Sequence, residues 1–268
     1  TCLELYQDFL EDASPFMIDF GDLSSACSET NPMIPLMPPT PRRGAFALSW
    51  SELERWDTFF YRKDFMDLDR RLSLIDFATL DDLLEFESRS WHDVYTSGDD
   101  FCYIEISSVT KEEGIVACTT VPVDDAPSRA TTLVKEGDII LSTTRPYLGA
   151  FAIVPSQYDN CVCSSGFALA TGLRSPELVP EYLILFLKTE AGLRQMERRM
   201  TGGLYPAIVL DELKKIKIPL LPSLEQQRIV DIVVNGKEHL RREREEAEKR
   251  FSEEEKRLES VILGHELQ

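Results

Sequence analysis

The sequence lacks the patterns that mark metal centres, membrane spans and secreted proteins. None of its six cysteines forms a CxxC pair, and its three histidines lie far apart, so we expect no zinc site. No apolar run approaches the roughly 18 residues that a membrane-spanning helix needs, and no signal-peptide pattern opens the chain. Scattered cysteines of this kind indicate reduced thiols, and we predict a cytoplasmic protein without a cofactor.

Catalytic signatures are also missing. No glycine-rich loop follows a strand-like run, which argues against a site for a methyl-donor cofactor. Residues 31–34, Asn-Pro-Met-Ile, are only distantly similar to the Asn-Pro-Pro-Tyr motif of amino-methyltransferases, because they lack the second proline and the aromatic ring that holds a flipped base. We therefore expect the chain to be neither a nuclease nor a methyltransferase in its own right.

Positive charge is scarce. The formal net charge is −18 over 268 residues, which argues against a nucleic-acid binder that acts alone. The excess is uneven, because residues 1–100 carry a net charge of −13, residues 101–200 carry −3 and residues 201–268 carry −2. The middle and the end of the chain are nearly balanced, so the composition allows a local basic surface there.

The stretch 137–149, GDIILSTTRPYLG, combines a buried-strand pattern with a polar end. Its β-branched apolar run predicts a strand, and Pro146 ends the ladder because it has no N–H to donate. The strand end presents hydroxyls, a guanidinium and a phenol, from Ser142, Thr144, Arg145 and Tyr147. Such groups can bind phosphate oxygens and base edges, but they can equally hold a polar turn through their own hydrogen bonds.

Short apolar runs separated by turn residues fill much of the remaining chain. They predict strands at residues 101–106, 114–119, 138–143, 151–154, 166–170 and 213–221. Several short strands with turn signals between them are typical of an antiparallel sheet or a barrel-like domain.

A helix is predicted over residues 180–200. Arg194 and Arg198 lie four residues apart on one face of it, where they can either bind phosphates or pair with nearby glutamates. The following loop, with Gly203 and Tyr205, ends the helix and lets a partner approach the backbone closely, although a tight turn needs no ligand.

One long helical pattern dominates the C-terminal part. Ser223 and Gln226 resemble a capping box, and the pattern continues to about residue 262, which gives a length on the order of 60 Å. Apolar residues recur at heptad-compatible positions, at Leu240, Ala247, Phe251, Leu258 and Val261. We expect an antiparallel partner helix to cover them, with a solvated single helix as the alternative.

Seven blocks along the chain form an ordered series. They are residues 54–61 (ERWDTFFY), 101–109 (FCYIEISSV), 126–130 (APSRA), 137–149, 163–167 (CSSGF), 201–208 (TGGLYPAI) and 216–230 (IKIPLLPSLEQQRIV). In this order they resemble the target-recognition domain, and the conserved helix after it, of the specificity subunits of type I restriction–modification systems. Family members often carry a basic residue shortly after the Arg-Pro-Tyr run, whereas Gly149 and Ala150 stand here.

The resemblance implies an α+β fold, with a mostly antiparallel β target-recognition domain, packed helices and a long C-terminal α-helix for coiled-coil pairing. The expected division is an acidic and proline-rich arm or linker at 1–48, the recognition domain at 49–221 and the helix at 222–268. The implied function is sequence-specific recognition of double-stranded DNA by a non-catalytic subunit. Its partners would be a DNA methyltransferase subunit and a restriction subunit. The expected DNA contacts are Ser142, Thr144, Arg145, Tyr147, Arg194, Arg198, Gly203 and Tyr205.

Specificity subunits of the family typically hold two recognition domains and two long helices, and this chain holds one of each. It is therefore expected to be either a half-size subunit that forms a homodimer through its helix or a piece of a longer polypeptide. The alternative is an acidic protein-interaction or DNA-mimic module with the same fold. In that case the first hundred residues would bind a basic partner rather than DNA.

Overall fold

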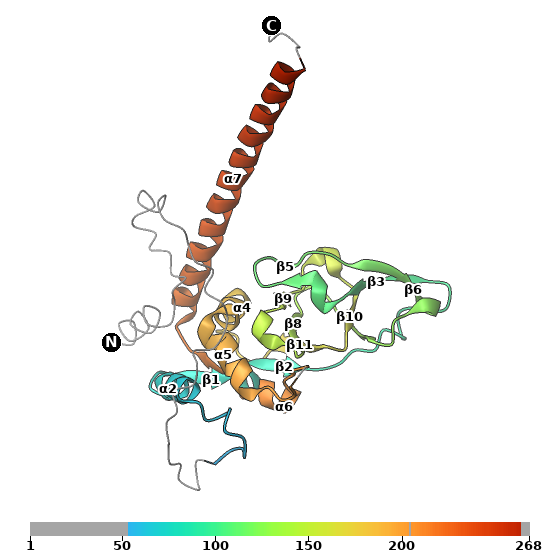
Figure 1. Ribbon diagram of the computed structural model, residues 1–268. Helices are drawn as coiled ribbons and strands as arrows, with labels where there is room; N and C mark the ends of the chain where they lie inside the picture. Colours follow the sequence, from blue (N-terminus) through green and yellow to red (C-terminus); the bar gives the residue numbers. More distant parts are fainter. Residues whose placement is uncertain (1–52, 204, 264–268) are drawn as a thin grey trace. The chain divides into compact units, whose positions relative to one another are not determined.

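The structure is a computed structural model that describes residues 53–203 and 205–263, so the predicted arm at 1–48 lies outside the described residues. The chain divides into two compact units, Thr1–Pro176 with Leu183–Leu220 and Glu177–Tyr182 with Leu221–Gln268. The first unit holds the strands of the described residues, and the second is built around one long helix (Figure 1).

The strands of the first unit form four small sheets. One four-stranded sheet has the order β6 (Thr119–Pro122), β3 (Asp100–Ile104), β10 (Val162–Ser164) and β7 (Ala130–Leu133). The other has the order β2 (Leu84–Phe86), β11 (Phe167–Leu173), β8 (Ile139–Ser142) and β9 (Phe151–Ile153). The two-stranded sheets pair β1 (Phe77–Thr79) with β12 (Lys217–Pro219), and β4 (Val109–Thr110) with β5 (Gly114–Ile115). Among the strands of the described residues, only β3 and β10 run parallel to each other, which confirms the predicted mostly antiparallel α+β fold.

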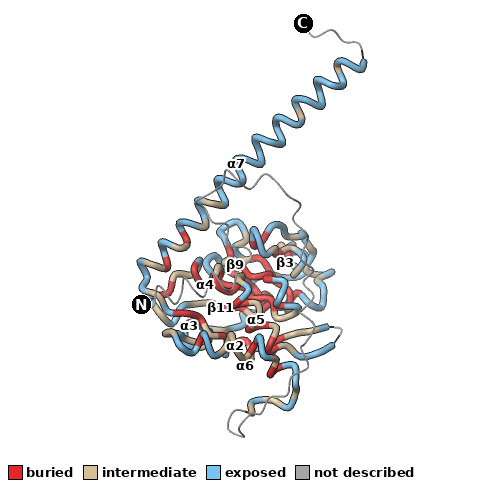
Figure 2. Tube along the Cα trace, turned by 60° about the vertical axis from the view of Figure 1, so that its left-hand side comes forward, coloured by how far each residue is buried: buried red, intermediate tan, exposed pale blue. Residues whose placement is uncertain are grey.

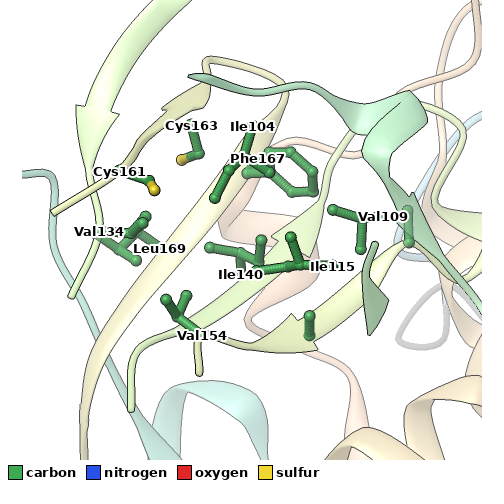
Figure 3. Packing of buried hydrophobic residues seen from close by; sticks show 12 residues of the cluster. Ile104, Val109, Ile115, Val134, Ile140, Val154, Cys161, Cys163, Phe167 and Leu169 are labelled. Carbon is green, nitrogen blue, oxygen red and sulfur yellow. The ribbon is translucent and has the colours of Figure 1, made fainter. Parts of the chain in front are cut away.

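The core lies where the two four-stranded sheets share one apolar cluster. Ile104 and Cys163 from the first sheet join Ile140 and Leu169 from the second (Figure 3). Side chains alternate along β3, so its other face sends Phe101 and Tyr103 into a second cluster around Trp91. Burying one such side chain contributes about 1.5–3 kcal/mol, so the two clusters fix the strand register.

The helix predicted over residues 180–200 is two helices, α4 (Pro180–Lys188) and α5 (Glu190–Arg199). Thr189 interrupts them because its backbone is extended, with ψ 165°, and its hydroxyl accepts from the Gly192 amide to cap α5. A Cβ at Gly192 would lie 2.5 Å from the Leu187 carbonyl oxygen, so only glycine permits this tight junction. Helical periodicity alone did not reveal the break, because both pieces keep an apolar stripe.

Two predicted strands are corrected by the structure. The run at 114–119 forms the separate strands β5 and β6. The run at 213–221 begins with the end of a short helix, α6 (Leu210–Leu213), and only its middle forms β12. The remaining short helices are α2 (Lys63–Leu72), α3 (Leu80–Leu83) and the 3₁₀ turns η2 (Ile106–Ser108), η3 (Val123–Asp125), η4 (Pro146–Leu148) and η5 (Ser156–Tyr158).

The predicted long helix is confirmed as α7 (Ser223–Ile262), which passes through Asn235 and Gly236 without a break. Most of its length is exposed (Figure 2), and ion pairs four residues apart, such as Arg244 with Glu248, support it. The predicted capping box is wrong. The Ser223 hydroxyl donates to the Glu177 carbonyl oxygen (2.9 Å), and Pro222 occupies the cap position.

Among residues 53–203 and 205–263, none of the helices combines the length and the apolar character that crossing a membrane requires.

Candidate functional site

The start of β8 is fixed by an ion pair between the buried Asp138 and the partly exposed Arg89. Asp138, only 3% exposed, accepts hydrogen bonds from both terminal nitrogens of Arg89 and from the Lys135 amide. The hydrogen bond to Asp138 raises the pKa of the Arg89 guanidinium further above its ordinary value. The N-terminal end of β8 is therefore held firmly, and its C-terminal end, at Ser142, leads into an exposed loop.

The chain turns sharply where β8 ends. In the β8 loop (residues 143–149), Arg145 adopts the left-handed conformation, with φ 47° and ψ 51°. A side chain in this region costs about 1–2 kcal/mol, so surrounding bonds must hold it there. Pro146 follows as the buried first residue of η4, where its fixed φ suits the start of a helical turn.

A second segment, the α5–α6 loop (residues 200–209), lies beside the β8 loop and holds it in place. The Arg145 amide donates to the Pro206 carbonyl oxygen (2.9 Å). The Ile208 amide donates to the Thr143 carbonyl oxygen (2.9 Å). These main-chain bonds leave the Arg145 backbone little freedom, which explains why a costly conformation persists.

Tyr205 stands next to Arg145 in this arrangement. The guanidinium carbon of Arg145 lies 6.0 Å from the centroid of the Tyr205 ring, at the outer limit of a cation–π contact. Both side chains are exposed, Tyr205 to 76%, and the phenol of Tyr147 on η4 is 38% exposed. The fold thus brings together three residues that the sequence predicted as site residues on two separate loops.

Gly202 is the glycine that shapes the α5–α6 loop, and a DNA contact at Gly203 stays a prediction. Gly202 has φ 93°, and a Cβ there would lie 2.9 Å from the Tyr205 carbonyl oxygen. A Cβ at Gly203 would meet nothing within 4 Å, and the residue is exposed. Gly203 therefore offers room on the surface, whereas the chain reversal depends on Gly202.

Two further cations border the β8 loop. The Lys111 side chain crosses Gly149, where an added Cβ would lie 3.1 Å from Lys111 Cγ. Arg129 is tied to the loop through Ser165, whose amide donates to the Arg129 carbonyl oxygen (2.7 Å). The carbonyl oxygen of Gly166, the residue after Ser165, accepts from the Thr143 amide at the start of the β8 loop (2.7 Å). Lys111 thus places a positive charge at the turn where the sequence lacks a basic residue after Arg-Pro-Tyr.

Three cations at the β8 loop have no carboxylate partner, namely Lys111, Arg129 and Arg145. Within the described part of the chain, no carboxylate oxygen lies within 4.0 Å of their side-chain nitrogens, and all three residues are exposed. Other arginines of the unit do contact a carboxylate, namely Arg55, Arg62, Arg70, Arg89, Arg174, Arg194, Arg198 and Arg199. The three unpaired cations can take an anionic ligand without first breaking an ion pair.

The hydroxyls predicted at the end of β8 serve the turn itself. Ser142 is fully buried, and its Oγ donates to the Thr144 carbonyl oxygen (2.7 Å). Thr143 Oγ1 donates to the Gly166 carbonyl oxygen (2.9 Å), and Thr144 is half-buried. These bonds match the alternative that the sequence left open, a polar turn held by its own hydrogen bonds. A DNA contact from Ser142 or Thr144 stays a prediction.

Arg194 and Arg198 on α5 are likewise occupied within the protein. Arg194 lies 3.3 Å from Asp64 and 3.4 Å from Glu190, with Glu197 at the same distance. Arg198 is only 7% exposed. Its guanidinium lies over the Phe60 ring, and its Nε donates to the Phe60 carbonyl oxygen. Pairing with carboxylates was the alternative to phosphate binding, and phosphate binding by these two arginines stays a prediction.

Comparison with known families identifies one family over most of the described chain. Residues 75–246 match the family described as the type I restriction modification DNA specificity domain. This range includes the β8 loop, the α5–α6 loop and the first part of α7.

Individual relatives agree with this family. The specificity subunit of the type I restriction enzyme HindI from Haemophilus influenzae is 29% identical over 118 residues, which are 43% of this chain and 26% of that subunit. The crystal structure of the HsdS subunit from Thermoanaerobacter tengcongensis is 29% identical, with a TM-score of 0.54 over 70% of this chain and 47% of that chain. A chain solved in work on assembly and conformational transition of the type I restriction–modification system is 29% identical, with a TM-score of 0.53 and the same coverage. This chain therefore spans about a quarter of the curated relative and slightly under half of the solved chains.

Proposed function

Because the chain belongs to the family of type I restriction modification DNA specificity domains, we propose that it is a DNA-reading part of a type I restriction–modification specificity subunit. In this proposal the first unit binds double-stranded DNA through the β8 loop and the α5–α6 loop. One observation carries it: an exposed Arg145 without a carboxylate partner lies beside an exposed Tyr205, and main-chain bonds fix the two loops together.

Arg145 is the proposed base reader. Its guanidinium can donate two parallel hydrogen bonds to O6 and N7 of a guanine, which is worth about 1–3 kcal/mol of discrimination. The fixed backbone at Arg145 reduces the conformational entropy that binding would otherwise cost. Tyr147 and Tyr205 offer hydroxyls and ring faces on either loop, and Gly203 leaves room for the DNA backbone.

Lys111 and Arg129 are proposed to position the DNA through phosphates. Each phosphate that a cation neutralises adds about 0.9 to the slope of log affinity against log salt concentration. Arg194 and Arg198 could contribute in the same way only by giving up carboxylate contacts, so we rank them below the unpaired cations. Ser142 and Thr144 are proposed to act mainly by holding the loop that presents Arg145.

The chain is proposed to be non-catalytic and cytoplasmic, and to work with a DNA methyltransferase subunit and a restriction subunit. A net charge of −18 opposes binding to DNA by this chain alone, so basic surface from a partner would be needed. On α7, apolar side chains are exposed at Leu240, Phe251, Leu258 and Val261. This seam fits another helix, from a second copy of the chain or from a further part of a longer polypeptide.

The test is selection of DNA from a randomised duplex pool by the complex with the methyltransferase subunit. We expect the wild-type complex to enrich one sequence, and Arg145→Ala to lose the preference at one guanine by about 10- to 100-fold. Arg174→Ala is the matched control. Arg174 is exposed and follows the end of β11 that lies farther from the β8 loop. Its replacement removes the same charge and should keep the sequence preference.

Two results would contradict the proposal. Equal losses in both variants would mean that Arg145 contributes charge but does not read a base. A stable complex with the methyltransferase subunit that binds no duplex at any salt concentration would favour the acidic interaction module instead.

A further inference from the structure

Three cysteines that are far apart in the sequence meet on one face of the β6–β3–β10 sheet. Cys102 is on β3, Cys118 immediately precedes β6, and Cys161 immediately precedes β10. Their sulfur atoms all lie within 4.8 Å of one another. The spacing of these cysteines gave no reason to expect a cluster, because only the strand order makes their strands neighbours.

The strand register explains the meeting. On β3, Cys102 pairs with Thr120 of β6, and Tyr103 pairs with Val162 of β10. Cys161, one residue before Val162, therefore falls beside Cys102, and Cys118, two residues before Thr120, approaches from the same face of the sheet. Cys102 lies within a strand, and Cys118 and Cys161 each directly precede one, so the strand pairing would set the ligand positions before any ion arrives.

We propose that Cys102, Cys118 and Cys161 form a binding site for one soft, thiophilic metal ion held by three thiolate sulfurs. Metal–sulfur bonds of about 2.3 Å place neighbouring sulfurs roughly 4 Å apart, so the observed separations need only small side-chain shifts. Within residues 53–203 and 205–263, no fourth histidine, cysteine or carboxylate completes the group. Three thiolates without a hard ligand suit Cu(I), or Zn²⁺ with a water molecule as its fourth ligand.

The cluster is accessible from solvent, unlike the neighbouring thiol of Cys163. Cys102 and Cys118 are partly exposed, so an ion can reach the site, whereas Cys163 is fully buried in the core (Figure 3). Burial raises the pKa of Cys118 to about 11 and that of Cys161 to about 12, so both thiols are protonated in the metal-free protein. Cys118 and Cys161 therefore each release a proton to solvent when they bind the ion, and no oxidant or reductant is needed.

Neighbouring groups are compatible with a cation. The Tyr95 hydroxyl donates to the Asn160 carbonyl oxygen (2.8 Å), one residue before Cys161. Burial is the largest cause that raises the pKa of Tyr95, so this hydroxyl stays a hydrogen-bond donor beside the residue before Cys161. A bound ion would tie together β3, β6 and β10, and β6 is an edge strand that would gain most from the link.

The experiment uses the full purified chain, reduced and stripped of metal. Accessible thiols and bound metal are counted after adding Zn²⁺ or Cu(I), each buffered by a competing chelator in the absence of oxygen. We expect one ion per chain, three thiols lost to labelling and a raised thermal midpoint with at least one of the two ions. Cys102→Ser and Cys118→Ser, at partly exposed positions where folding should survive, are expected to weaken binding at least 10-fold.

Matched controls separate this site from the other cysteines. Cys163→Ser, and a joint Cys2→Ser and Cys27→Ser variant of two positions outside the described residues, should keep the stoichiometry and the thermal shift. The proposal is overturned if neither ion protects three thiols. It is also overturned if Cys102→Ser and Cys118→Ser bind as tightly as the wild type, or if binding disappears with Cys2 and Cys27.

Discussion

The amide of Arg145 donates a hydrogen bond to the carbonyl oxygen of Pro206, 2.9 Å away, while Arg145 itself occupies the left-handed region with φ 47°. The strained backbone of Arg145 is therefore held by the α5–α6 loop, which is about 60 residues away in the sequence. Strain of this kind is often kept where a side chain must be presented in one orientation.

This relationship predicts how two substitutions at Arg145 differ in stability. Both Arg145→Gly and Arg145→Ala remove the guanidinium, but only glycine adopts this backbone conformation without steric cost. We expect Arg145→Gly to be about 1 kcal/mol more stable than Arg145→Ala by urea denaturation. Both variants should lose the DNA preference equally. Equal stabilities would show that the loop relaxes when the side chain is removed.

Arg198 is predicted to be a stability residue. Its guanidinium lies 4.1 Å from the centroid of the Phe60 ring and 3.3 Å from Asp69. Arg198→Ala should lower the free energy of unfolding by about 3 kcal/mol, because it opens a cavity beside Phe60 and removes one partner of the half-buried Asp69. Arg194→Ala, at a more exposed position, should cost no more than about 1 kcal/mol. A folded Arg198→Ala variant with normal stability but weak DNA binding would restore the phosphate role.

Asp69 should contribute to stability except in acid. Partial burial raises the pKa of its carboxyl, but hydrogen bonds and charges from Lys217 and Arg198 lower the pKa by more, so it lies below its ordinary value. A carboxyl with a lowered folded pKa stabilises the fold fully above its unfolded pKa of about 3.9, and this contribution is lost as the pH falls through the folded pKa.

The measurement is the unfolding free energy from pH 7 downward. Asp69→Asn should be less stable than the wild type at pH 7, and the difference should shrink as the pH falls below about 4. Asp211→Asn removes an exposed carboxylate and serves as the control, with little change at any pH. A constant difference across the range for Asp69→Asn would show that packing, not ionisation, sets its contribution.

Lys111 should affect the salt dependence of DNA binding by the complex. If its ammonium contacts one phosphate, Lys111→Ala should reduce the slope of log affinity against log salt by about 1, with little change in sequence preference. Lys63→Ala is the matched control, because Lys63 is also exposed but lies on α2, away from the β8 loop. Equal slopes for both variants would remove Lys111 from the interface.

Gln226 is predicted to hold the second unit together. Its side chain is 1% exposed, accepts from the Val179 amide (2.8 Å) and donates to the Leu221 carbonyl oxygen (2.7 Å). Gln226→Leu leaves these buried groups without partners and should cost about 2 kcal/mol in thermal or chemical unfolding. The exposed neighbouring position gives the comparison, since Gln227→Leu should change stability by less than about 0.5 kcal/mol.

Local signals in the amino-acid sequence were enough to predict several elements of secondary structure. The continuous apolar and β-branched run before Pro146 predicts β8, and the unbroken helical pattern from Ser223 to about residue 262 predicts α7, because both signals are properties of neighbouring residues. The two loops that carry Arg145 and Tyr205 also followed from their own turn residues. The ordered blocks placed these elements in one family of DNA specificity domains.

Which predicted site residues lie together, and which already contact a carboxylate or a ring, depends on how distant segments pack in the folded chain. Arg145 and Tyr205 share one surface because the α5–α6 loop bonds to the β8 loop, while Arg198, on an equally promising helix face, is covered by Phe60. The same holds for the meeting of Cys102 and Cys161, which depends on β3 lying next to β10. These contacts join segments far apart in the chain, and local patterns do not encode the order in which strands pair or the carboxylate that each cation finds.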